Sequence, residues 1–130
     1  HPDAGANITR IAGRLPLHAS SSGLVLLAYA PAAVRASVLG GPLRAVSGET
    51  ITDPRTLERV IAGIRRDGVA IAPGSIQSVS TGVAVPLRHE GEVVAALSVV
   101  LPRDADPTPA VAALRDAVAA IESDLRRQRL

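Results

Sequence analysis

One short segment carries the residue types best suited to binding chemistry. It runs Leu15-Pro16-Leu17-His18-Ala19-Ser20-Ser21-Ser22-Gly23 and leads into an apolar run, Leu24 to Ala28. This order predicts a loop that enters a helix, because serine is a favoured N-cap whose hydroxyl accepts a hydrogen bond from a first-turn N–H. Small side chains leave the other N–H groups of that turn approachable, which suits an anion. The alternative is an ordinary helix cap without a ligand.

Other chemistry is not supported by the sequence. The three histidines, His1, His18 and His89, show no metal-ligand spacing, and the chain has no cysteine. No strand leads into a G-x-S-x-G turn at Ser22, and no glycine-rich phosphate loop is present. A triad of Ser20, His18 and an acidic residue is the one enzymatic alternative. We therefore predict no enzyme, no cofactor and no metal site.

Composition limits the kinds of partner. The 130 residues are enough for one domain with a packed core. Hydrophobic residues make up 47% of the chain and aromatic residues only 1%, with Tyr29 the sole example, so no aromatic platform is available for stacking bases. The formal net charge is only +2, and the high pI reflects fourteen arginines without lysine rather than a nucleic-acid surface.

The apolar pattern predicts helices around an antiparallel hairpin, an α+β class. Thr52-Asp53-Pro54 indicates a helix start, and Gly68 indicates its end. A β-branched apolar run over 93–101 predicts a second hairpin strand buried on both faces. The other expected elements are a strand at 8–12, helices to about 30 and over 32–39, a loop over 43–51, a strand at 69–72, a turn at 73–75, a first hairpin strand from 82, a turn at 89–92 and a long helix over 107–128.

The chain shows neither a signal peptide nor an apolar run near the roughly 20 residues that a membrane span needs. We therefore expect no membrane contact and a cytoplasmic location.

Several segments then follow one another in a specific order. They are Gly13-Arg14-Leu15-Pro16-Leu17-His18-Ala19-Ser20, Gly23 with Leu26-Leu27-Ala28, Ile51-Thr52-Asp53-Pro54 with Leu57, Ile64-Arg65-Arg66-Asp67-Gly68, Val83-Ala84-Val85-Pro86, and Gly91 with the run Val93 to Val99. Together they resemble the effector-binding domain of IclR-family bacterial transcriptional regulators over nearly the whole chain.

The resemblance implies a GAF-like fold, in which helices flank an antiparallel sheet. It implies that residues 1–130 are an effector-binding domain without the first helix and two strands that family members carry before the position of Gly13. The winged helix-turn-helix domain is absent as well, so we expect DNA contact only through that absent domain and no specific DNA binding by this chain alone. The resemblance also implies a homodimer or homotetramer.

The resemblance further implies a small organic acid, including aromatic acids, as effector of a ligand-sensing regulatory domain. The positions that match the family's pocket, together with Gly23 from the helix start, are Leu15, Ser21, Ser22, Gly23, Ala72, Ser80, Gly82, Ser98 and Val100. Many members carry acidic residues between 68 and 86, cysteine at Gly82 and a polar residue at Val100. These departures favour a less polar or larger ligand, and they leave open the alternative of an assembly module with a degenerate pocket.

Two expectations are specific enough to compare with a structure. Ser98 is the only polar residue in the run 93–101, and a buried hydroxyl needs a partner, so we expect it to face a pocket. The alternative is that its hydroxyl donates to a neighbouring backbone carbonyl. We also expect Ser21, Ser22 and Gly23 to present free backbone N–H groups towards a cavity bounded by Leu15, Gly82 and Ser98.

Overall fold

The computed structural model describes residues 16–128, which form four helices and a three-stranded antiparallel sheet. The elements are α2 (Ser21–Ala28), α3 (Ala32–Gly40), α4 (Pro54–Asp67), β1 (Ala70–Pro73), β2 (Ser80–His89), β3 (Glu92–Pro102) and α5 (Thr108–Arg127). The predicted α+β class is confirmed. The strand expected at 8–12 and the candidate residue Leu15 lie outside the described residues.

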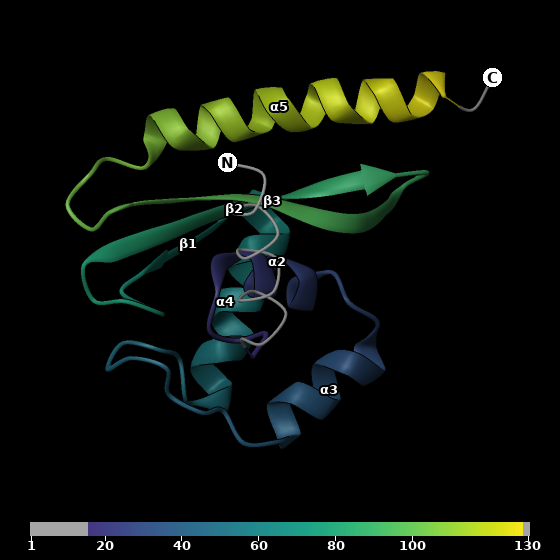
Figure 1. Cartoon of the computed structure of the whole chain (residues 1–130). Coiled ribbons are helices and arrows are strands. Elements are labelled where there is room, and N and C mark those ends of the chain that lie inside the picture. Colours follow the sequence, from purple (N-terminus) through teal and green to yellow (C-terminus); the bar gives the residue numbers. More distant parts are fainter. Residues whose placement is uncertain (1–15, 129–130) are drawn as a thin grey trace, which may run out of the picture.

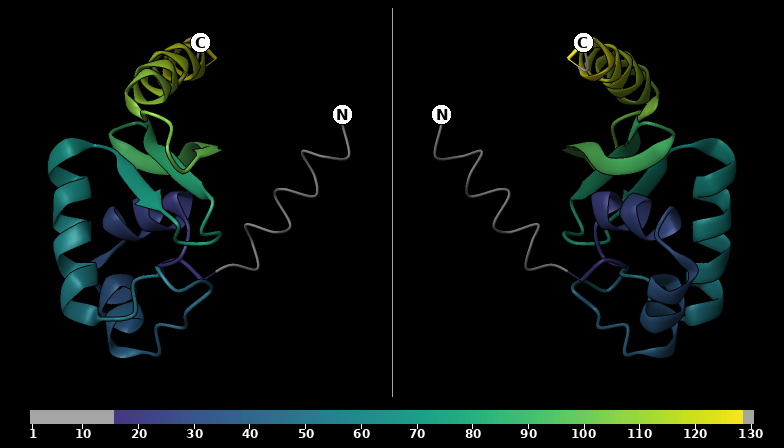
Figure 2. Two further views of the ribbon diagram at one scale, coloured as in Figure 1. Left: turned by 90° about the vertical axis from the view of Figure 1, so that its left-hand side faces the viewer. Right: turned by 90° about the vertical axis from the view of Figure 1, so that its right-hand side faces the viewer.

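The sheet lies between two layers of helices (Figures 1 and 2). Helix α5 packs on one face and α2 packs on the other, and α4 and α3 pack against α2 and against each other. The larger hydrophobic cluster joins α2, α4 and the sheet, with Leu24, Leu27 and Leu57 fully buried. A smaller cluster joins Val83 and Val85 of β2 to Leu114 and Val118 of α5.

Local capping chemistry explains the bounds of α4. The Asp53 carboxylate accepts a hydrogen bond from Thr56 N, and Pro54 occupies the first turn, where its missing N–H is not needed. Gly68 ends the helix in the left-handed region with φ 71°, and its N–H donates to Ile64 O at 2.7 Å. The predicted helix between Thr52-Asp53-Pro54 and Gly68 is therefore confirmed.

The hairpin is also confirmed, and its turn explains why. Strands β2 and β3 are joined by the two residues Glu90 and Gly91, with φ 55° and 83°. Positive φ at both central positions is the turn geometry that matches the natural twist of a hairpin. Strand order is β1-β2-β3, so β3 is an edge strand among the described residues.

The expectation that the strand over 93–101 is buried on both faces is wrong. Its residues alternate in exposure, and Val94 and Val100 are 55% and 72% exposed. One face of β3 packs towards α5 through Leu97, Val99 and Leu101. Helix α2 packs on the opposite face of β3 but leaves Val94 and Val100 exposed, so a continuous apolar run did not mean two buried faces.

The sequence of α5 has an apolar stripe at helical spacing, which predicts one buried face and consists of Val111, Leu114, Val118, Ile121 and Leu125. The structure buries only part of this stripe. Leu114 and Val118 are buried and Val111 packs beside them, but Ile121 is 38% exposed.

None of the described helices is long and apolar enough to cross a membrane.

Candidate functional site

The start of α2 shows which backbone donors are available. Ser20 is the N-cap, and its hydroxyl accepts a hydrogen bond from Gly23 N at 2.9 Å. The N–H groups of Ser21 and Ser22 come earlier in the first turn, where an α-helix provides no partner, and no described residue accepts from them. The expectation of a free N–H at Gly23 is therefore wrong, whereas the N–H groups of Ser21 and Ser22 have no partner among residues 16–128.

Gly23 has a packing role instead. A Cβ placed there would lie 2.9 Å from Leu17 Cα and 2.9 Å from Ser20 Oγ. The loop before α2 thus folds back directly onto the helix start. Spacing along the sequence could not show this approach, because Leu17 and Gly23 meet only through the turn between them.

Ser21 brings the helix start into contact with the sheet. It is 6% exposed, and its Oγ and Cβ lie 2.7 Å and 3.1 Å from the position that a Cβ on Gly82 would occupy. Gly82 therefore leaves the space that Ser21 fills. Two predicted site residues, 61 positions apart in the chain, are direct neighbours.

Gly82 belongs to a row of three residues across the sheet. It pairs with Ala72 on β1 and with Val100 on β3, and we call Ala72, Gly82 and Val100 the Gly82 row. Directly paired residues of an antiparallel sheet point to the same face. Because Ala72 packs into the α2–α4 cluster and Gly82 meets Ser21, the row lies on the face covered by α2.

The other predicted residues flank this row. Ser80 and Ser98 lie on the same face by strand alternation, two residues from Gly82 and from Val100 respectively. Ser80 is half-buried, and its hydroxyl donates to Gln77 O at 3.3 Å. Ser98 is exposed, so no described residue encloses it in a pocket. The structure thus gathers the described candidates around the start of α2, with the β3 side open.

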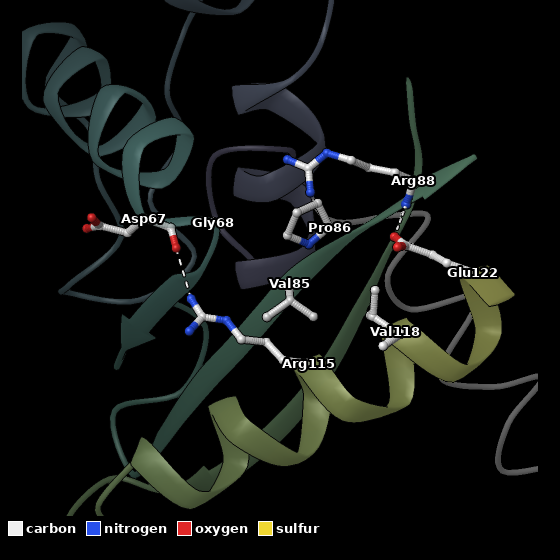
Figure 3. Close-up of a pocket in the computed structure, with 9 residues that line it drawn as sticks. Asp67, Gly68, Val85, Pro86, Arg88, Arg115, Val118 and Glu122 are labelled. Carbon is white, nitrogen blue, oxygen red and sulfur yellow. Dashed lines mark hydrogen bonds between the residues drawn. The ribbon is translucent and has the colours of Figure 1, made fainter. Parts of the chain in front are cut away.

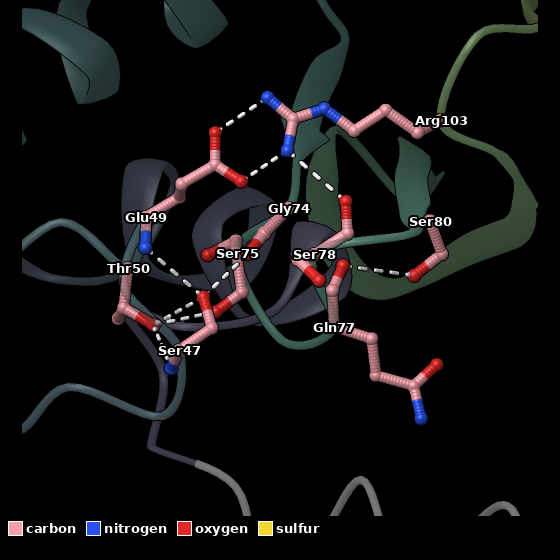
Figure 4. A network of polar contacts seen from close by, with 9 residues as sticks. All are labelled: Ser47, Glu49, Thr50, Gly74, Ser75, Gln77, Ser78, Ser80 and Arg103. Atoms are coloured by element: carbon pink, nitrogen blue, oxygen red, sulfur yellow. Dashed lines mark hydrogen bonds and ion pairs between the residues drawn. The ribbon is translucent and has the colours of Figure 1, made fainter.

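Side-chain hydrogen bonds between loops hold this region together. His18 is buried, and its Nε2 donates to Arg44 O at 2.7 Å. Thr50 and Ser75 are also buried and hydrogen-bonded across three loops (Figure 4). Serine and threonine in loops are common turn formers, so sequence alone gave no signal of this network.

An ion pair closes the outer side of the same loops. The Arg103 guanidinium bonds both carboxylate oxygens of Glu49 and also Ser78 O (Figure 4). The hydrogen bond from Arg103 holds the pKa of Glu49 below its usual value. Gly74 has φ 66°, and a Cβ there would collide with both side chains, so the turn requires glycine.

The described residues contain no group of three or more histidine, cysteine, aspartate or glutamate side chains that could hold a metal ion. The chemistry available at the start of α2 is therefore hydrogen bonding to an acceptor. A carboxylate suits two adjacent N–H groups at the positive end of the helix dipole.

A separate hollow of about 350 Å³ lies between α4, β2 and α5 (Figure 3). Its polar groups join elements to one another: Arg115 Nη2 donates to Asp67 O at 2.9 Å, and Arg88 N donates to Glu122 Oε2 at 2.7 Å. The Arg88 guanidinium lies over the Tyr29 ring, 5.1 Å from its centroid. None of the predicted site residues that the structure describes lines this hollow.

Comparison with known proteins identifies the family to which this fold belongs. Residues 3–123 match the family described as bacterial transcriptional regulator IclR C-terminal. The Probable transcriptional regulator SauR of Cupriavidus necator is 35% identical over 91 residues, which cover 68% of this chain and 36% of SauR.

Solved structures show the same fold. A crystal structure of an IclR homologue complexed with 4-hydroxybenzoate, from Microbacterium hydrocarbonoxydans, is 53% identical with a TM-score of 0.87 and covers 89% of this chain and 48% of that one. An IclR homologue from Microbacterium sp. strain HM58-2 is also 53% identical, with a TM-score of 0.84 over 86% of this chain and 47% of that one. The chain thus spans about half or less of these relatives.

Fold and similarity define the C-terminal domain of a bacterial transcriptional regulator. The chain belongs to the IclR family. That family consists of transcriptional regulators, so the predictions of the family and of a non-enzymatic regulatory domain are confirmed.

Proposed function

We propose that this chain is the GAF-like effector domain of an IclR-type regulator and that it binds a small aromatic carboxylic acid. The observation that carries the proposal is the contact of Ser21 with Gly82, which brings the first-turn N–H groups of Ser21 and Ser22 to the sheet beside the exposed Val100 of β3. The relative that binds 4-hydroxybenzoate supports the choice of ligand class, because it is 53% identical over most of this chain.

The two parts of such a ligand fit different parts of the site. Its carboxylate accepts hydrogen bonds from Ser21 N and Ser22 N, where the helix dipole favours negative charge. Its ring covers apolar surface on the open side of the Gly82 row, where Val100 is 72% exposed. Ligand sites commonly combine an apolar wall with a few placed polar groups. Leu15, Ser80 and Ser98 stay candidate lining residues.

In the whole regulator, the ligand would alter DNA binding by a winged helix-turn-helix domain outside this chain. We further propose that the whole regulator contains the first helix and two strands of the effector domain. We also propose that it assembles as a homodimer or a homotetramer. We also place the domain in the cytoplasm, where bacterial DNA lies.

Calorimetric titration of the 130-residue chain with 4-hydroxybenzoate tests the proposal, with 4-hydroxybenzamide as the neutral analogue. We expect binding of the acid and much weaker binding of the amide. Ser22→Asp should abolish acid binding, because it places a negative charge where the carboxylate binds. Arg127→Ala, at the far end of α5, should leave affinity unchanged.

A domain that only mediates assembly would give different results. It would bind neither compound, and its melting temperature would not respond to a panel of aromatic acids. A ligand present at a hundredfold its Kd should instead stabilise the native state by about 2.7 kcal/mol. If Ser22→Asp binds the acid with unchanged affinity, the ligand does not bind at the start of α2.

A further inference from the structure

Two buried hydroxyl groups connect three separate loops beside the start of α2. Thr50 and Ser75 are 7% and 5% exposed. Thr50 lies in the loop before α4, and Ser75 lies in the turn between β1 and β2. Neither belongs to the site residues that the sequence indicated.

The hydroxyl of Thr50 has three close hydrogen-bond partners. Its Oγ1 donates to Ser75 O and accepts from Val46 N and Ser47 N at 3.0 Å and 2.9 Å. These three bonds fill the one donor and two acceptor positions of a hydroxyl, and Ser47 Oγ lies further away at 3.5 Å. Figure 4 shows Thr50, Ser47 and Ser75 drawn together around this group.

Ser75 carries the connection to the helix start. Its Oγ donates to the carbonyl oxygen of Ala19, a fully buried residue that directly precedes the N-cap Ser20. One residue earlier, His18 donates to Arg44 O. The loop over 16–20 is therefore attached at two adjacent residues to the segment over 44–50, once directly and once through Ser75.

We propose that Thr50 and Ser75 are positioning residues of the effector site, which hold Ala19 and thereby fix the Ser21 and Ser22 N–H groups where a carboxylate binds. This inference rests on the proposed function. The two residues do not touch the ligand. They act through the loop over 16–20, since a small displacement of that loop changes the direction of both donors.

Thr50→Val is the sharpest substitution, because valine keeps the shape of threonine without the hydroxyl. It leaves Ser75 O, Val46 N and Ser47 N without their partner, and the buried turn must rearrange to satisfy them. Thr50→Ser keeps the hydroxyl and serves as the rescue variant. Val118→Ala removes methyl groups from the α5 side of the sheet and is the control for lost stability alone.

The first measurement is the Kd for 4-hydroxybenzoate by calorimetry, alongside the melting temperature of each variant. We expect Thr50→Val to weaken binding at least tenfold, whereas Thr50→Ser and Val118→Ala stay within about threefold of the unaltered chain. If Thr50→Val binds as the unaltered chain does, or if Val118→Ala weakens binding equally at the same loss of stability, the positioning role is overturned.

The second measurement needs no ligand and separates this inference from the proposed function. Amide exchange of Gly23, whose N–H is bonded to Ser20 Oγ, reports whether the helix start is held. We expect it to be at least fivefold faster in Thr50→Val and unchanged in Thr50→Ser and Val118→Ala. Failure of the unaltered chain to bind any acid would contradict the proposed function. An unchanged Gly23 exchange rate in Thr50→Val would contradict the positioning role of Thr50 and Ser75.

Discussion

At the scale of single residues, Gly82 decides how closely α2 approaches the sheet. A Cβ at this position would lie 2.7 Å from Ser21 Oγ and 3.1 Å from Ser21 Cβ. The hydroxyl can rotate away, but the Ser21 Cβ is fixed by the helix. A Cβ at position 82 therefore requires the helix start to shift by a few tenths of an ångström away from the sheet.

We predict that Gly82→Ala lowers the free energy of unfolding by about 1–3 kcal/mol, the usual range for overpacking, and weakens binding of 4-hydroxybenzoate. Urea unfolding and calorimetry measure the two effects. Gly40→Ala is the matched control, because a Cβ there meets nothing within 4 Å. Equal stability of Gly82→Ala and the unaltered chain would show that the close contact with Ser21 is not needed.

The sequence predicted part of this residue-scale picture. The serine run indicated the start of α2, and the structure confirms Ser20 as its cap. The free donor expected at Gly23 was wrong because Ser20 uses it, and the roles of Thr50 and Ser75 were missed because their partners are backbone carbonyls of distant loops. Carbonyl positions are set by the fold and leave no pattern in the side chains.

At the scale of elements, α4 carries a glycine whose substitution should help. Gly63 lies inside the helix, and the nearest atom to a Cβ there is Arg66 Nη2 at 3.7 Å, an ordinary contact. We predict that Gly63→Ala raises the free energy of unfolding by about 0.5–1 kcal/mol, because alanine loses less conformational freedom in a helix. A lower urea midpoint for Gly63→Ala than for the unaltered chain would contradict the placement of Gly63 inside α4 with room for a Cβ.

The N-cap of α4 should give the stability a pH dependence. The Thr56 hydroxyl, and then backbone N–H groups, lower the pKa of Asp53. A carboxyl whose pKa is lowered on folding stabilises the protein above its unfolded pKa of about 3.9, and this contribution disappears as the pH falls through the folded value.

We therefore predict that the melting temperature of the unaltered chain falls more steeply below about pH 4 than that of Asp53→Asn, which keeps a capping side chain but does not titrate there. The measurement is thermal unfolding monitored by circular dichroism from pH 2 to pH 7. Parallel curves for the two proteins would show that the Asp53 carboxylate does not stabilise α4.

Elements with their own capping signals were the ones predicted best. Asp53, Pro54 and Gly68 bounded α4, and the turn at Glu90-Gly91 bounded the hairpin. The burial of β3 was not predictable in the same way. Valine and leucine favour strands at an edge as well as in a centre, so their run could not show that one face of β3 is open near Val100.

At the scale of the whole molecule, the number and position of the basic residues do not indicate a DNA-binding element. The net charge is +2, and Arg126 and Arg127 lie in the last turn of α5, where positive charge complements the helix dipole. We predict that the chain alone binds no specific DNA. A gel-shift assay that shows sequence-specific, salt-resistant binding would contradict this.

If an aromatic carboxylate binds at the start of α2, an NMR titration of the ¹⁵N-labelled chain with 4-hydroxybenzoate should show it most directly. We predict that the backbone amides of Ser21 and Ser22 shift most, accompanied by those of Gly82 and Val100 across the sheet. Saturable shifts concentrated at Arg88 and Arg115 instead, or no shift at Ser21 and Ser22 while the ligand binds, would contradict it.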